Sequence, residues 1–280
     1  MDLTQVGAAL LSALLHAGWN AAVKASPRTN EAMTAQMVVS AAISVPGLVW
    51  SGVPAPASWI WIAASTALNL VTVTALLRAY DLVGFGMVYP VVRALSVLLV
   101  VPLAAALSGE RLGASGLIGI ALVSSSLLLL ARGDAGGHAV PRAAFGWIGL
   151  AGVATAAYVT CDAQGVRHAG SPCAYGFLVS ITNAIAMWGK QSAVANPWRM
   201  VTGHLTVGVP AAAASMASYL LILWVFSQAP IAPAAALRDT SAIFAILIAV
   251  VWLREPFTRL RLLAVALSAA AVPLLRFASR

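Results

Sequence analysis

Two arginines stand inside long apolar runs, where an ionised side chain is expensive. Arg93 interrupts the run from 84 to 107, and Arg238 interrupts the run from 231 to 253. The planar guanidinium fork can hold a carboxylate through two parallel hydrogen bonds. It can equally pin neighbouring helices through backbone carbonyls or through Asp239. Each arginine is therefore a candidate for substrate binding or for structural bracing, and the two can have unequal roles.

Composition places these runs in a membrane. The chain has 280 residues, of which 61% are hydrophobic and only 9% charged, and its mean hydropathy is +0.92. A soluble domain carries about 25% charged residues. A charge at the bilayer centre costs at least ~2.5–3.5 kcal/mol, so we expect both arginines to face a wet cavity or a partner. The net charge of +8 is spread over short connectors and predicts no nucleic-acid surface.

A spanning helix needs roughly 20 mostly apolar residues. Runs of that kind, separated by polar or Pro/Gly breaks, predict an all-α membrane protein with ten transmembrane helices. The predicted spans cover residues 4–24, 32–52, 57–80, 84–108, 113–132, 145–166, 172–193, 203–228, 231–253 and 259–277.

The two arginines occupy matching positions in the two halves of the chain. A shift of 145 residues aligns three identical pairs: Arg93 with Arg238, Ser96 with Ser241 and Glu110 with Glu255. Each glutamate ends the span that carries the arginine. A weaker match, at a shift of 139, aligns Trp19 with Tyr158.

This register predicts two repeats of five helices. Residues 1–133 form the first repeat, residues 134–143 a connector, and residues 144–280 the second repeat. Because five is odd, the second copy must enter the membrane from the opposite side. Inverted repeats of this kind are common in transporters, whose substrate sites lie near the midplane between the halves.

SGERL at the end of the fourth span, LREPF at the end of the ninth, and AYVTCDAQGVR at 157–167 carry a family resemblance. Over essentially its whole length the chain resembles the drug/metabolite transporter superfamily, in its ten-helix EamA-type branch. It is most similar to bacterial aromatic amino-acid exporters. The resemblance implies export of amino acids or other small metabolites across the bacterial inner membrane. It also implies cytoplasmic termini and a cavity lined by spans one, three, four, six, eight and nine.

Basic residues gather towards one side of the predicted bundle. That side carries Lys24, Arg28, Arg78, Arg132, Arg142, Lys190, Arg199, Arg254, Arg259 and Arg261, and the other carries Arg111, Arg167, Arg276 and Arg280. The positive-inside rule then puts both termini outside. This orientation is opposite to the one that the resemblance implies, and both stay open here.

Further candidates lie on the arginine-bearing spans and on the first, sixth and eighth spans. Residues three or four apart share a helix face. Candidate substrate-binding and cavity residues are Arg238, Arg93, Trp19, His16, Asn20, Tyr89, Tyr158, Tyr219, Asp239 and Ser241. Each has a structural alternative: His16 can bond a neighbouring helix, the aromatic side chains can serve as packing, and Asp239 can neutralise Arg93.

Two further groups are expected to shape the spans. Candidate hinge or gating residues at the entries to the arginine-bearing spans are Gly84, Gly86, Pro90, Pro230 and Pro233, which can bend a helix start. Glu110 and Glu255 are expected to be structural, capping or bracing a neighbouring helix in each half.

The leading hypothesis is an exporter of amino acids, including aromatic and hydrophobic ones, that works by alternating access. No acid lies in the first span between Thr4 and Lys24, which disfavours a drug exporter for cations. Export of other small anionic metabolites is the alternative, and a polyspecific drug exporter is disfavoured. Asp162 and Asp239 are the acids well inside spans, so proton coupling and facilitated diffusion both stay open.

Other classes fit less well. No catalytic Ser/His/Asp set or HExxH motif appears, so we do not expect an enzyme, and neither a cofactor nor a metal site is expected. A structural membrane protein would have no use for matched arginines, and a central cavity reached from one side would distinguish a transporter from it. The expected partners are a small-molecule substrate and the lipid bilayer of a bacterial inner membrane, with a monomer as the functional unit.

Overall fold

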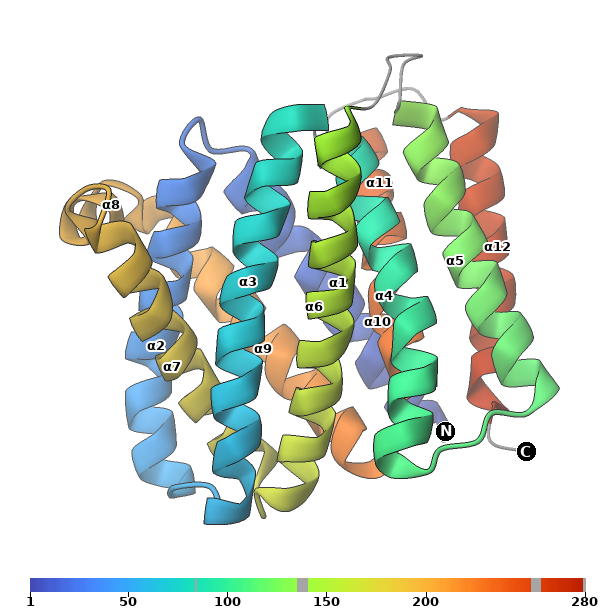
Figure 1. Ribbon diagram of the computed structural model, residues 1–280, viewed down its shortest axis with the longest axis horizontal. Coiled ribbons are helices and arrows are strands. Elements are labelled where there is room, and N and C mark those ends of the chain that lie inside the picture. Colours follow the sequence, from blue (N-terminus) through green and yellow to red (C-terminus); the bar gives the residue numbers. More distant parts are fainter. Residues whose placement is uncertain (84, 135–140, 253–257, 279–280) are drawn as a thin grey trace.

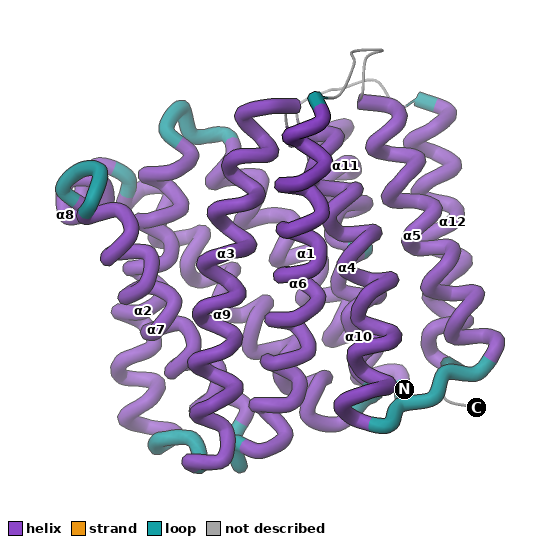
Figure 2. Tube along the Cα trace, in the orientation of Figure 1, coloured by secondary structure: helices purple, strands orange, loops and turns teal. Residues whose placement is uncertain are grey.

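The computed structural model describes residues 1–83, 85–134, 141–252 and 258–278, and every regular element in these ranges is a helix (Figures 1 and 2). The elements are α1 (Leu3–Lys24), α2 (Thr29–Ser51), η1 (Pro56–Ser58), α3 (Trp59–Val83), α4 (Phe85–Ser108), α5 (Ala114–Asp134), α6 (Arg142–His168), α7 (Pro172–Ser192), α8 (Pro197–Gly203), α9 (Leu205–Gln228), α10 (Ile231–Asp239), α11 (Ser241–Trp252) and α12 (Arg259–Arg276).

Seven helical segments among the described residues are long and apolar enough to cross a membrane. They are Leu3–Lys24, Thr29–Ser51, Pro56–Val83, Met87–Ser108, Ala114–Arg132, Arg142–His168 and Leu205–Gln228. Large apolar side chains face outward, as Trp50 and Ile60 do at 83% and 72% exposure, whereas alanines such as Ala9 and Ala13 are fully buried. Small residues inside and large apolar ones outside are the pattern of a helix bundle surrounded by lipid. The chain is therefore an α-helical membrane protein.

The segment 231–253, predicted as one span, is divided in the structure. Helix α10 ends at Asp239, Thr240 forms a turn, and α11 begins at Ser241. Neither piece alone is long enough to cross a bilayer. The break lies directly after Arg238 and Asp239, not at the prolines of the helix entry.

The remaining two predicted spans, 172–193 and 259–277, form the helices α7 and α12. Helix α7 carries Asn183 and Lys190, and α12 carries three arginines within 18 residues. Both helices have at least 18 residues, so composition and not length places them outside the group that qualifies as spanning.

Six helices surround the centre of the bundle. Helix α3 packs against α6, α1 against α9, and α4 against α6, while α10 packs against both α1 and α4. The pairs α5–α12 and α2–α7 flank this group at its two ends (Figure 1). The arginine-bearing helices α4 and α10 therefore meet in the interior, with α1 beside both.

Local signals fix where several helices begin and end. Asp2 and Gln5 form a capping box at the start of α1, and the Ser171 side chain caps α7 by accepting from the Ala174 N–H. Gly170 has a φ of +76°, which an L side chain adopts only with strain. This glycine allows the tight reversal from α6 into α7.

Candidate functional site

A cavity of about 680 Å³ runs into the centre of the bundle from one end. Its mouth is lined by Pro27 and Arg28 in the α1–α2 connection and by Asp81 near the end of α3. Among the residues that the structure describes, none from the connections at the opposite end (52–58, 109–113, 169–171 and 229–230) contributes to its wall. The cavity is therefore open towards one end of the bundle only.

Eight of the ten candidate cavity residues line this space, and two lie behind its wall. The lining residues are His16, Trp19, Asn20, Tyr89, Arg93, Tyr158, Tyr219 and Arg238. Asp239 and Ser241 are buried next to Arg238 without lining the cavity. The eight residues come from five helices, α1, α4, α6, α9 and α10, and α3 adds Ser65 and Tyr80 to the lining.

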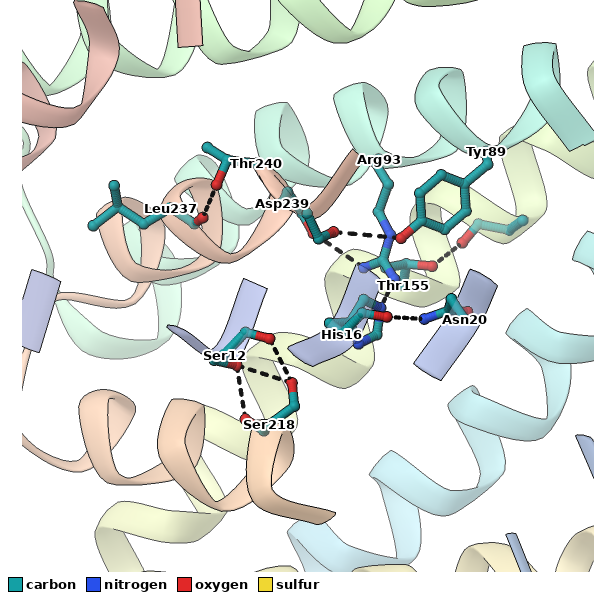
Figure 3. A network of polar contacts seen from close by, with 12 residues as sticks. Ser12, His16, Asn20, Tyr89, Arg93, Thr155, Ser218, Leu237, Asp239 and Thr240 are labelled. Carbon is teal, nitrogen blue, oxygen red and sulfur yellow. Dashed lines mark hydrogen bonds and ion pairs between the residues drawn. The ribbon is translucent and has the colours of Figure 1, made fainter. Parts of the chain in front are cut away.

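Arg93 is held by partners from two other helices (Figure 3). Its Nη1 forms an ion pair with Asp239 Oδ1 at 3.0 Å, and its Nη2 lies 2.9 Å from His16 Nε2. Its guanidinium also lies over the Tyr89 ring, 5.1 Å from the centroid. The three residues Arg93, Asp239 and His16, which we call the charged junction, thus join α4, α10 and α1.

Arg238 has a different environment from Arg93, although the two align in sequence. Its side chain lines the cavity and is buried at 7% exposure. Within the described part of the chain, no hydrogen bond or ion pair engages it, and its Nε is buried without a partner. The two arginines are therefore unequal: Arg93 is neutralised by protein groups, and Arg238 faces the cavity as a cation.

Polar atoms without protein partners concentrate on the cavity wall. Besides Arg238 Nε, the Trp19 Nε1, Thr72 Oγ1 and Asn183 Oδ1 atoms are buried and have no hydrogen-bond partner among the described residues, and all four side chains line the cavity. Buried polar atoms in proteins are nearly always hydrogen-bonded. Two further such atoms, Ser124 Oγ and Arg276 Nε, lie away from the cavity, so four of the six belong to side chains of its wall.

Asp162 brings a negative charge to the same cavity. Its carboxylate accepts hydrogen bonds from Ser65 Oγ (2.5 Å), Tyr175 Oη (3.2 Å) and Tyr219 Oη (2.8 Å), which come from α3, α7 and α9. Gly165, one turn further along α6, makes this possible, because a side chain at that position would overlap the Tyr175 ring. Asp162 therefore ties four helices together and still lines the cavity.

The sequence marks Asp162 as an acid well inside a span, but Asp162 is not among the predicted site residues, and neither are Ser65 and Tyr175. The available signal was an acid inside an apolar run, which is the same signal that identified the two arginines. Ser65 and Tyr175 are far from Asp162 in sequence, and nothing in their own surroundings marks them.

Below the cavity, neutral hydrogen bonds close the bundle. Ser12 Oγ donates to the Ser218 carbonyl and Ser218 Oγ donates to the Ser12 carbonyl, both at 2.7 Å, and the two hydroxyl oxygens lie 3.1 Å apart (Figure 3). Ser12 lies one turn from His16 on the side away from the mouth. We call this reciprocal pair the serine floor.

Glu110 braces the closed end. Its carboxylate accepts the Ile231 N–H at the start of α10, with distances of 2.9 and 2.8 Å to its two oxygens, and pairs with Arg167 Nη2 at 3.1 Å. Arg167 also donates to the Phe226 and Ala229 carbonyls. Glu110 thus connects the end of α4 to α6, α9 and α10. Its aligned partner, Glu255, lies outside the described residues.

The candidate hinge residues have varied positions. Gly84 lies outside the described residues, Gly86 belongs to α4, and Pro90 lies within that helix, which continues through it. Pro230 is the residue before α10, and Pro233 lies in the first turn of that helix.

Comparison with known proteins identifies the fold alone. No protein-family model and no curated protein sequence matches the chain. A solved structure described as "Crystal structure of protein" superposes with a TM-score of 0.74, covering 96% of this chain and 94% of that chain at 15% sequence identity. It is one of 28 solved chains that match. The arrangement of helices is therefore one that other proteins share.

The charged junction predicts a strong effect on stability. Asp239→Asn would leave Arg93 buried without its carboxylate, so we expect a loss of about 3–5 kcal/mol, measured as thermal or denaturant unfolding in detergent. Asp81→Asn, at an exposed position of the cavity mouth, is the matched control and should change little. The double variant Arg93→Gln/Asp239→Asn should be more stable than Asp239→Asn alone. An Asp239→Asn protein as stable as the wild type would contradict this role.

Proposed function

We propose that the protein is a ten-span transporter built of two inverted five-helix repeats, which exports amino acids by alternating access. The observation that carries the proposal is the one-sided cavity, with a buried, unpartnered arginine at its closed end. In either of its two states, an alternating-access carrier has a cavity that reaches the middle of the bundle from one side only. A purely structural membrane protein has no use for it.

The helix packing supports the inverted repeat. We take α1, α2, α3, α4 and α5 to correspond to α6, α7, α9, α10–α11 and α12. Exchanging each helix for its counterpart turns the pair α1–α9 into α6–α3, and both pairs pack in the structure. The pairs α2–α7, α5–α12 and α4–α10 map onto themselves and also pack. Helix α6 begins at the end of the bundle opposite to the start of α1 (Figure 1), as inversion requires.

The lining supports an amino acid as the substrate. Arg238 offers a guanidinium fork suited to a carboxylate. Around it, Trp19, Tyr158, Tyr219 and Met216 give the wall an aromatic and apolar character that suits a bulky side chain. The resemblance to aromatic amino-acid exporters of the drug/metabolite transporter superfamily agrees with this reading. Other small anionic metabolites are the alternative substrates, since Arg238 alone would also accept them.

Charge distribution supports an export direction. Lys24 and Arg28 line the cavity mouth, and the helix ends that carry Arg78, Arg132, Arg142 and Lys190 lie at the same end of the bundle (Figure 1). The positive-inside rule puts this end in the cytoplasm. The cavity would then be open to the cytoplasm, where an exporter of the bacterial inner membrane loads its substrate, and both chain ends would lie outside.

Orientation can be tested with topology reporters. We expect alkaline phosphatase fused to the C-terminus to be active and green fluorescent protein at the same place to be dark, because the basic end of the bundle stays in the cytoplasm. A reporter within the 193–196 connection, at the basic end, is the internal control and should give the opposite result. Fluorescence from the C-terminal fusion would support the cytoplasmic termini that the family resemblance implies.

Transport should depend on Arg238. Uptake of labelled amino acids into proteoliposomes, with protein-free liposomes as the blank, measures it. We expect Arg238→Gln to lower kcat/KM about 10- to 100-fold, since a charged hydrogen bond contributes about 1.5–3 kcal/mol. Because Arg238 has no partner in the described protein, the same variant should unfold at an equal or higher temperature than the wild type. Arg111→Gln, at the opposite end, is the matched control, and unchanged transport by Arg238→Gln would refute the assignment.

The serine floor should open when the carrier changes state. In a Cys161→Ser/Cys173→Ser background, Ser12→Cys/Ser218→Cys places two thiols where hydroxyl oxygens are 3.1 Å apart, a spacing compatible with a disulfide. Oxidation should stop transport and reduction should restore it. Either single cysteine variant is the control and should be insensitive to oxidant. Full transport by the quantitatively cross-linked protein would show that the floor does not open.

A further inference from the structure

We propose that the closed end of the cavity recognises both charged groups of a free amino acid: Arg238 binds the carboxylate and Asp162 binds the ammonium group. The inference rests on the proposed transport of amino acids and makes it more specific. It assigns a binding role to Asp162 and narrows the substrate class from carboxylates in general to zwitterions.

The interior of the cavity contains charges of both signs. Among the described residues, three ionised side chains line its inner part, away from the mouth: Arg93, Arg238 and Asp162. Arg93 is already compensated by Asp239, which lies behind the wall. Arg238 and Asp162 have opposite charges, and neither has an ion-pair partner in the described part of the chain, not even the other. One positive and one negative charge therefore face the same space without a direct ion pair.

Arg238 and Asp162 lie at a similar depth. Arg238 is seven residues after Ile231 at the start of α10, and Asp162 is six residues before His168 at the end of α6. Both helix ends lie at the closed end of the bundle (Figure 1). At 1.5 Å per residue, the Cα atom of each residue lies roughly 10 Å from that end. Arg238 also lies within electrostatic range of Asp162. A small ligand at the bottom of the cavity can therefore meet both.

The surroundings of Asp162 suit an ammonium group. A carboxylate has about four acceptor positions, and three of them receive hydroxyl donors. Ser65 and Tyr219 also line the cavity, and their oxygens keep lone pairs after donating to Asp162. An ammonium group, which has three donors and no acceptor, can thus bond to Asp162, Ser65 and Tyr219 together.

A ligand with only one charged group would leave one of the two side chains without a partner of opposite charge. An organic anion would compensate Arg238 and leave Asp162 buried and unpaired, and an organic cation would do the reverse. A buried charge without a partner is strongly unfavourable. A zwitterion whose two groups are held by one carbon compensates both charges at once, so the site discriminates against ligands that carry only one of them.

Competition among three ligands that share one side chain tests the inference. Uptake of labelled phenylalanine into proteoliposomes is measured against unlabelled phenylalanine, 3-phenylpropanoate and phenethylamine. We expect the last two, each lacking one charged group, to compete at least tenfold more weakly than phenylalanine. In Asp162→Asn, unlabelled phenylalanine should compete at least tenfold more weakly than in the wild type, while competition by 3-phenylpropanoate should be unchanged or stronger. In Arg238→Gln, competition by phenylalanine should weaken, while competition by phenethylamine should not.

Tyr175→Phe is the matched control, because it removes one hydrogen bond from Asp162 and keeps the carboxylate. It should retain the preference for the zwitterion. If wild-type protein takes up phenylalanine but 3-phenylpropanoate competes equally well, transport stands and the zwitterion site is overturned. If no amino acid is taken up, the proposed function itself fails. If Asp162→Asn does not fold, the wild-type series of analogues decides the question alone.

Discussion

A charge in the low-dielectric interior of a membrane protein needs a compensating charge, and the centre of this bundle is organised by that requirement. Arg93 on α4 meets it through Asp239 on α10 and His16 on α1. Because the three groups come from three helices, none of those helices can shift far without exposing a bare charge. The charged junction therefore sets the relative positions of the helices that form one side of the cavity.

The same requirement distinguishes two kinds of contact at the centre of the bundle by their strength. The junction is ionic, so breaking it costs several kcal/mol. The serine floor consists of neutral hydrogen bonds, each with a net contribution of about 1 kcal/mol. A carrier of the proposed kind would have to break contacts on one side of its site and keep the helices aligned. In this bundle the weak contacts lie below the site, and the strong one lies beside it.

Much of this arrangement could be predicted from sequence, because hydropathy and isolated charges are local signals. The helical membrane class and the inward position of Arg93, Arg238 and Tyr219 follow from apolar runs and helical spacing. Pairing of Asp239 with Arg93 was one of the alternatives that the sequence left open, but the sequence could not decide between them, since Asp239 lies next to Arg238 in the chain and bonds to Arg93 across the bundle. The helix break at Thr240 was also not predictable, because neither glycine nor proline marks it.

That break gives a physical reason for the different roles of two aligned arginines. Arg93 lies within a helix that continues on both sides of it, whereas Arg238 lies in the last turn of α10. The end of a helix carries unpaired carbonyl groups and a partial negative charge, which favour a cation by about 0.3–1 kcal/mol. This field lessens the cost of Arg238 without occupying its guanidinium. A cation that is partly stabilised by backbone and left open to the cavity can exchange its ligand, which a cation locked in a buried ion pair cannot do.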